Sequence, residues 1–118
     1  MSLSQRLDKR VTIKEKSVTR ASNGEEVVIW VPFAALTPAG DGKVWAEVEP
    51  IRGREFFAAA QMQGAADYRV TLRYTPLITR AMRVYFGSII LEITAEPINV
   101  KSASRVLELM CVSGVRDG

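Results

Sequence analysis

The sequence predicts a mainly β protein, a small antiparallel β-barrel or sandwich of about seven short strands with one short α-helix. Apolar and polar residues alternate over several short segments, which is the period of a half-buried strand. Turn-forming residues separate these segments at short intervals, as they do in small antiparallel domains. A single run of helix-favouring residues interrupts the pattern near the middle of the chain.

The segment 44–61 joins a strand to this helix. Apolar residues alternate with Trp and Glu over 44–49, and Pro50, which lacks an N–H for a sheet ladder, ends the strand. The run after the corner at 52–55 is rich in Ala, Gln, Phe and Met, which favour helix, and Gly64 can end it. A helix of roughly ten residues is marginal alone in water, so we expect it to pack on the sheet.

The other strands are predicted by the same alternation. The clearest is 67–75, where a face of Tyr, Val and Leu alternates with a face of Arg and Thr. Gly87–Ser88 fits a two-residue hairpin connection. We expect a polar loop over 17–26, with a turn at Asn23–Gly24, and a second loop, rich in Pro and Gly, over 32–43. The remaining predicted strands are 11–16, 27–31, 82–86, 89–94 and 105–112, and residues 1–9 are expected to form a short arm or helical turn. The residues expected to face the core include Val11, Ile13, Leu107, Leu109 and Cys111.

Length and composition predict one soluble globular domain. A chain of 118 residues has room for one ordinary core, which we place at residues 5–112 with a loose tail over 113–118. The N-terminus lacks the apolar core of a signal peptide, and no apolar run is long enough for a membrane span. Cys111 is the only cysteine, which excludes an internal disulfide and fits synthesis in a cytosol.

The net charge of +3 is unevenly distributed along the chain. Residues 1–20 carry six basic and two acidic side chains, residues 21–50 carry one basic and five acidic, and residues 51–118 carry nine basic and six acidic. This polarity suits a protein that contacts different partners at its two ends. For any single charge, a solvated surface of mixed sign is the simpler interpretation.

No combination of residues predicts catalysis or metal binding. The chain has no His, and a single Cys can form neither a Cys–His pair nor a zinc site. The segment 40–42 lacks the length and the Lys-Ser/Thr ending of a phosphate-binding loop. Glu47 and Glu49 share one predicted strand face, where solvation explains them more simply than acid–base chemistry. We therefore expect neither an enzyme nor a cofactor.

Several side chains are candidates for contact with a partner. Trp30 and Trp45 could lie at an interface, where Trp is enriched, or have core or half-buried packing in the domain, which we favour for Trp45 and weigh equally for Trp30. The apolar residues of 33–36 need burial against either a partner or the chain's own barrel. The corner at 52–55 could form an inter-subunit salt bridge or a local ion pair. The candidate interface residues are Trp30, Phe33, Leu36, Arg52, Arg54 and Glu55.

Short sequence elements also occur in an order typical of one protein family. They are Leu7–Ile13, Asn23–Gly24 before Trp30, Val44–Glu55 with its Trp45-Ala46 and Gly53-Arg54-Glu55, Tyr68–Tyr74, Ile78–Val84, Leu91–Thr94 and Leu107–Cys111. With these elements, about residues 5–112 resemble the head–tail joining proteins of long-tailed bacteriophages and prophages, also called head-closure, stopper or connector proteins. The chain differs from that family in the longer separation between Trp30 and Trp45, with residues 32–42 as the extra length.

The resemblance implies a structural virion protein without catalysis, made in the bacterial host cytoplasm and placed at the head–tail interface. It implies a cyclic homo-oligomer, hexameric or dodecameric, that lies between the portal or adaptor and the tail, closes the head and offers the tail a docking surface. Loops of such proteins line or plug the central channel. If the predicted loop over 17–26 faces that channel, Lys16 and Arg20 would contact packaged DNA in a nonspecific, salt-sensitive way.

Two further expectations concern assembly and the alternative function. A ring needs two different, complementary faces on each subunit, and the basic N-terminal segment and the acidic segment 21–50 could supply them. The alternative is a small-barrel, OB-like nucleic-acid-binding module, which would use exposed aromatic side chains beside basic ones. Tyr68 and Tyr74 instead fall on the apolar face of their predicted strand, where we expect core packing.

Overall fold

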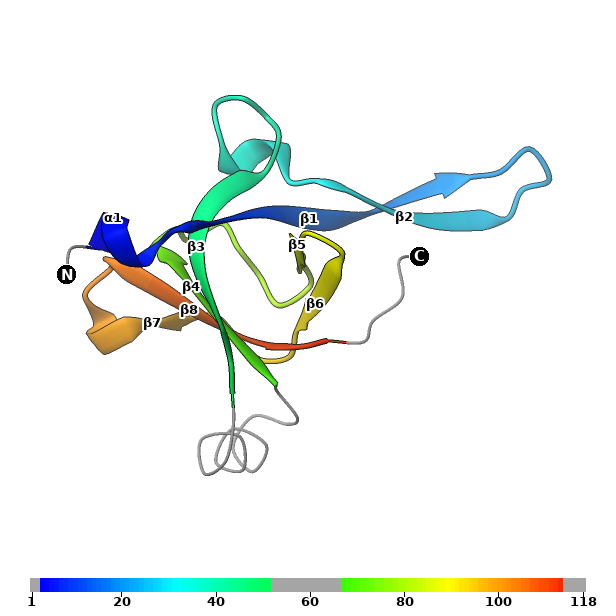
Figure 1. Cartoon of the computed structure of the whole chain (residues 1–118). Helices are drawn as coiled ribbons and strands as arrows, with labels where there is room; N and C mark the ends of the chain where they lie inside the picture. Colours follow the sequence, from blue (N-terminus) through cyan, green and yellow to red (C-terminus); the bar gives the residue numbers. More distant parts are fainter. Residues whose placement is uncertain (1–2, 52–66, 114–118) are drawn as a thin grey trace.

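The computed structural model describes residues 3–51 and 67–113, which are mostly in β-strands (Figure 1). The strands are β1 (Lys9–Arg20), β2 (Glu26–Pro32), β3 (Lys43–Pro50), β4 (Tyr68–Arg73), β5 (Arg83–Phe86), β6 (Ile89–Ile93), β7 (Ile98–Asn99) and β8 (Val106–Val112). Short helical turns are α1 (Leu3–Arg6), η1 (Ala34–Leu36) and η2 (Val100–Ser102). The predicted helix after Glu55 lies outside the described residues.

Six of the strands close into an antiparallel barrel. Their order is β1-β3-β4-β8-β6-β5, and β5 pairs with β1 to complete the circle. β7 pairs with β8 and β2 pairs with β1, both outside the closed path. The mainly β prediction of a small antiparallel barrel is therefore confirmed. β7 lies between the predicted strands 89–94 and 105–112, and its two residues are too few for alternation to be recognised.

Alternate strand positions fill the interior of the barrel with apolar side chains. Ile13, Val84, Leu91 and Leu109 have no exposed surface, because every second residue of a strand points to the same face. Tyr68 and Tyr74 pack against this cluster from its edge, as predicted. The inward orientation predicted for residues of the first and last strands is also confirmed, with Val11, Ile13, Leu107, Leu109 and Cys111 all buried.

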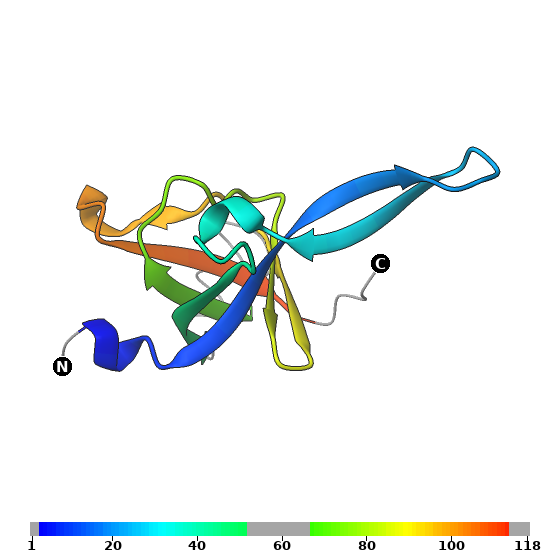
Figure 2. The same cartoon turned by 90° about the horizontal axis from the view of Figure 1, so that it is seen from above.

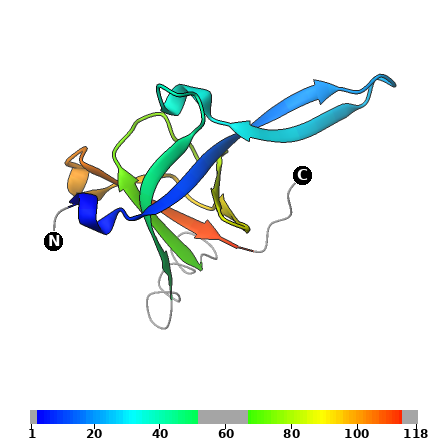
Figure 3. The ribbon, with the colours of Figure 1, turned by 45° about the horizontal axis from the view of Figure 1, so that its top comes forward.

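The longest strand, β1, takes part in two structures. Its first half belongs to the barrel, and from Glu15 onwards it pairs only with β2. The β1–β2 ladder has seven residue pairs, from Lys14↔Pro32 to Arg20↔Glu26. Figures 2 and 3 show this second half and β2 extending away from the barrel as a two-stranded hairpin. We call residues 14–32 the arm.

The polar loop predicted over residues 17–26 is too long, because residues 17–20 belong to β1 and Glu26 begins β2. Ser17 and Thr19 continue the alternation of β1, and Thr is a residue type that fits a strand well. Only residues 21–25 form the connection. The turn predicted at Asn23–Gly24 is confirmed: the Glu25 N–H donates to Asn23 Oδ1 at 3.0 Å, and Gly24 has a φ of +88°.

β2 and β3 follow one another along a single edge of β1. Lys14 pairs with Pro32 and Thr12 with Lys43, so the intervening residues 33–42 leave the ladder and return to it opposite Ile13. The Ile13 N–H donates to the Gly42 carbonyl and its own carbonyl accepts from the Phe33 N–H, both at 2.8 Å. Lys14 also pairs with Arg83 of β5, which therefore lies on the opposite edge of β1.

Candidate functional site

The arm carries an unusual share of exposed apolar surface. Six large apolar side chains are exposed among the described residues, and four of them are on the arm: Val18, Val27, Val28 and Ile29. Val18 is directly opposite Val28 on one face, and alternation places Val27 and Ile29 on the other. A two-stranded ribbon is marginally stable by itself, and exposed apolar strands favour association with another chain. The arm is therefore suited to be covered by a partner.

Charged residues cluster at the tip of the arm. Arg20 pairs in register with Glu26, and Glu25 precedes it in the connection. The two predicted DNA-facing residues, Lys16 and Arg20, are both exposed, and with Val18 they occupy alternate positions on one face of β1. The tip beyond Val18 therefore carries two carboxylates and one guanidinium, and Lys16 lies on the barrel side of Val18.

The outer face of β1 bears basic and aromatic side chains in close contact. The Lys14 ammonium lies 4.2 Å from the centre of the Tyr85 ring, and the Arg83 guanidinium lies 4.0 Å from that of Trp30. At the other end of the strand, the Arg10 guanidinium is 5.1 Å from the centre of the Trp45 ring. We call this row the basic–aromatic stripe. Cation–π contacts of this kind stabilise exposed sites by about 0.5–1 kcal/mol each.

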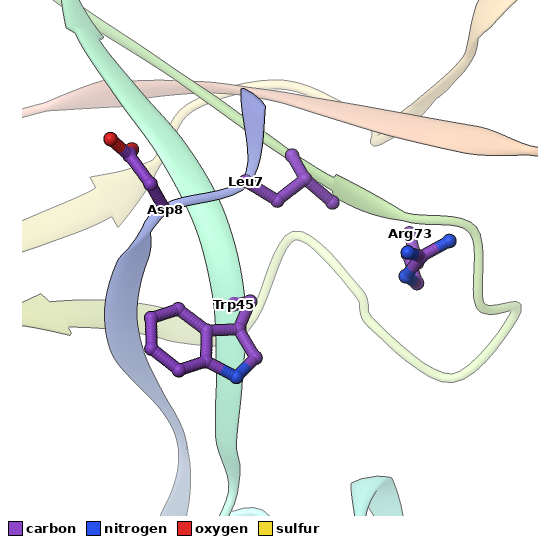
Figure 4. A pocket seen from close by; sticks show the side chains of 4 residues that line it. All are labelled: Leu7, Asp8, Trp45 and Arg73. Atoms are coloured by element: carbon purple, nitrogen blue, oxygen red, sulfur yellow. The ribbon is translucent and has the colours of Figure 1, made fainter. Parts of the chain in front are cut away.

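A hollow lies beside the start of β1. Leu7, Asp8, Trp45 and Arg73 line it, with a volume of about 380 Å³ (Figure 4). Leu7 is buried, whereas Trp45 is 53% exposed. Figure 4 shows the Leu7 side chain on the Arg73 side of the hollow, with the Asp8 carboxylate turned to the opposite side. We call it the Trp45 hollow.

Of the core or half-buried packing predicted for Trp45, the structure shows the half-buried form, with the residue 53% exposed. Its neighbour Ala46 points into the barrel and has no exposed surface, so alternation turns the indole outward. A second hollow of about 220 Å³ adjoins the first, since Trp45 and Arg73 line both. Its remaining lining residues are Leu36, Val44, Leu72, Tyr74 and Thr75. An exposed Trp thus stands between two hollows with mainly apolar walls.

The carboxylates near the Trp45 hollow already have basic partners. Asp8 Oδ2 lies 3.7 Å from Lys9 Nζ, and Glu47 Oε1 lies 3.1 Å from the Arg6 guanidinium. Arg73 makes no ion pair with any residue in 3–51 or 67–113. The hollow therefore offers an available positive charge beside an apolar surface.

The other predicted interface residues have different surroundings. Phe33 is 9% exposed and belongs to the core cluster, and Leu36 packs partly buried against the same cluster. The apolar segment 33–36 is expected to be buried against a partner or against the chain's own barrel, and these two residues pack against the barrel. Trp30 is partly buried under Arg83. Arg52, Arg54 and Glu55 lie outside the described residues, so their role stays a prediction.

Neither a metal-binding cluster nor a reactive thiol is found in the described part of the chain. No three or more of its His, Cys, Asp or Glu side chains are grouped so that they could hold a metal ion. Burial, with a smaller effect of the Asp67 charge, raises the pKa of the Cys111 thiol to about 12, so it is not a thiolate at neutral pH. The Lys43 N–H and then the Thr37 hydroxyl lower the pKa of Asp41, which closes the 37–43 turn. None of the described helices has the length and apolarity to span a bilayer.

A small closed barrel with a projecting apolar arm and a Trp-centred hollow has the construction of a protein-assembly module. The chain belongs to the phage head completion protein family, whose model matches residues 3–114. The family gives the protein a structural role in the phage head.

Two solved structures share the fold. The solution structure of protein SF1141 from Shigella flexneri 2a has a TM-score of 0.75 and 23% identity, over 99% of this chain and 100% of that one. A chain from the virion of the native gene transfer agent particle has a TM-score of 0.58 and 18% identity, over 90% of this chain and 93% of that one. At these identities the likeness establishes the fold. The comparison with curated protein sequences found no match.

Proposed function

We propose that the chain is a head–tail connector. Several copies form a closed ring, hexameric or dodecameric, between the portal or adaptor and the tail. The ring closes the filled head and offers the docking surface for the tail. The protein is made in the host cytoplasm and acts in the virion. The observation that carries the proposal is the arm, which projects from a complete barrel and exposes apolar side chains that the barrel itself does not need.

The arm supports assembly because the apolar surface that it exposes to water has no role in closing the barrel. The barrel closes through β5 and β1 without any contribution from β2. Exposed valine and isoleucine side chains on an extra hairpin lower solubility unless another chain covers them. A ring supplies such a cover for every copy, since each subunit contacts two neighbours through different faces.

A nonspecific contact with packaged DNA is part of this proposal. Lys16 and Arg20 are exposed on the same face of the arm. If the tip of the arm faces the central channel, the contact of these two long side chains with phosphates does not depend on base sequence and weakens as salt increases.

The proposed function is tested in the phage or prophage that encodes the chain. Removing the gene is expected to give filled heads that lose their DNA and do not attach tails, as seen by electron microscopy of lysates. Complementation with the wild-type chain restores particles, whereas Val18→Thr/Val28→Thr restores fewer. Leu77→Thr is the matched control, because Leu77 is 44% exposed but lies off the arm. Infectious particles formed without the protein would contradict the proposal.

A nucleic-acid-binding module is the second candidate, favoured by the basic–aromatic stripe. Lys14 and Tyr85 are in contact on the outer face of the barrel, where single-stranded bases could stack. A salt-titrated binding assay with single-stranded oligonucleotides separates the candidates. Sub-micromolar binding that is lost in Tyr85→Ala would favour this second function over the connector. Weak binding that is unaffected by Tyr85→Ala would support the connector.

A further inference from the structure

We propose that the arm of one copy binds in the Trp45 hollow of the next copy, so that subunits join head to tail. The inference rests on the proposed ring and identifies the two surfaces that form it. It starts from two unpartnered features of the same chain, an apolar projection and a hollow with apolar walls. A second copy is the one partner that satisfies both features at once, whereas a foreign protein would cover only one of them.

The two surfaces lie too far apart to meet within one chain. Leu7 lines the hollow, and Val18 is eleven residues further along, nearly all of them in β1. An extended strand rises about 3.3 Å per residue, so the two lie roughly 36 Å apart. Figure 1 shows α1 and the tip of the arm at opposite ends of the molecule. An arm that enters a Trp45 hollow must therefore come from another copy.

The apolar surfaces are complementary in kind. Trp45 and Leu7 form the apolar part of the hollow, and Val44 and Leu36 extend it in the adjoining one. The arm offers the adjacent valines Val18 and Val28 on one face. A half-exposed Trp beside a hollow is a typical centre of binding energy at protein interfaces.

The charges favour the same pairing. Arg73 at the hollow makes no ion pair among the described residues, and the same holds for Glu26 at the tip of the arm. The Asp8 charge is offset by Lys9. A tip with two carboxylates and one guanidinium therefore approaches a hollow whose available charge is positive. Oppositely charged patches steer association and fix the register of an interface.

A head-to-tail contact has a consequence that a symmetric one lacks. Each copy uses its arm on one neighbour and its hollow on the other, which closes into a ring when the rotation permits. A copy with a defective arm and a copy with a defective hollow still share one intact arm and one intact hollow. Their mixture can form one junction and cannot extend further.

The test uses the full chain with Val28→Asp as the arm variant and Trp45→Ala as the hollow variant. Sedimentation velocity over a concentration series is expected to show oligomers for the wild type and monomers for each variant, with self-association weakened roughly a hundredfold. The equimolar mixture is expected to form a heterodimer and nothing larger. Leu77→Asp, on an exposed residue off the arm, is expected to assemble like the wild type.

Every result of this test decides the inference. Oligomers formed by either single variant would overturn it, as would a mixture that stays monomeric, because two defects in a shared symmetric contact do not complement. A wild-type chain that stays monomeric would also overturn the inference, because free copies would then not form the contact between arm and hollow. That last result leaves the connector function standing, because the gene-removal experiment in infected cells tests it separately.

A charge exchange tests the orientation of the contact. Arg73→Glu and Glu26→Arg are each expected to weaken self-association about tenfold, and the double variant is expected to recover most of the loss. Far-ultraviolet circular dichroism checks that each variant keeps its strands. A double variant that assembles no better than the single ones would contradict contact between Glu26 and Arg73.

Discussion

The Ile13 N–H donates to the Gly42 carbonyl at 2.8 Å, at the point where β1 leaves the barrel and becomes the arm. A Cβ at position 42 would lie 2.5 Å from the Ile13 carbonyl oxygen and 3.0 Å from the Phe33 nitrogen. Gly42 also has a φ of +65°, which side-chain-bearing residues rarely adopt. This contact therefore holds the 33–42 segment against the strand that connects barrel and arm.

Gly42→Ala is expected to destabilise the protein strongly. The added methyl group meets backbone atoms that cannot move without breaking the ladder, so we expect the free energy of unfolding to fall by about 2–4 kcal/mol. Urea denaturation measures this change. Gly87→Ala is the matched control, because Gly87 also has a positive φ but open space around it, and its cost is expected to be about 1 kcal/mol. Equal effects of the two substitutions would contradict the close-contact explanation.

Leu109→Ala is expected to be more damaging than the equivalent change on the arm. Leu109 is fully buried in the barrel, and truncating a buried leucine costs about 2–5 kcal/mol. Ile29→Ala removes a side chain that is 41% exposed, so the isolated chain is expected to lose less than about 1 kcal/mol. Thermal unfolding of both variants checks the difference. A large loss for Ile29→Ala in a monomeric sample would mean that the arm packs against its own chain.

Asp67→Ala is expected to release the end of β8. The Asp67 carboxylate accepts hydrogen bonds from the Ser113 N–H at 2.9 Å and from the Ser113 hydroxyl at 2.6 Å. Losing bonds to a charged acceptor is expected to cost about 1–3 kcal/mol. Hydrogen exchange near Val112 is expected to quicken. Ser113→Ala removes the hydroxyl but keeps the N–H donor, so it is expected to lower the free energy of unfolding less than Asp67→Ala does. An equal loss of stability would contradict a shared role of the two bonds.

The Cys111 thiol is expected to be unreactive in the native protein. It is fully buried, and burial raises its pKa from 9.0 to about 12. The folded state thus keeps the thiol neutral while the unfolded state ionises above pH 9, so Cys111 lowers the free energy of unfolding progressively from pH 9 towards 12. Thiol labelling at pH 8 is expected only after unfolding. Between pH 9 and 10, the free energy of unfolding of the Cys111→Val variant is expected to fall less steeply than that of the wild type. Rapid labelling of the native protein would contradict this account.

The predictions from sequence succeeded where short-range patterns carry the information. Alternation identified the inward residues Val11, Ile13 and Leu109, and the Asn23–Gly24 pair identified the turn of the arm. The polar character of Ser17 and Thr19 led to a predicted loop that is too long, because a hairpin with both faces exposed resembles a loop in composition. The Trp45 hollow was missed. Its signal was the alternation of Trp45 with Ala46, which already placed the indole on the face opposite the core.

The sequence by itself determined a mainly β domain with known strand faces, no motif for catalysis, and a resemblance to phage head–tail joining proteins. Only the tertiary structure decided that β1 closes the barrel against β5 and then continues into the arm. It also brought Leu7, Trp45 and Arg73 together around one hollow. The physical reason is that a period of two defines two faces of a strand but not its neighbours. Pairing partners depend on contacts between distant residues, which no local pattern encodes.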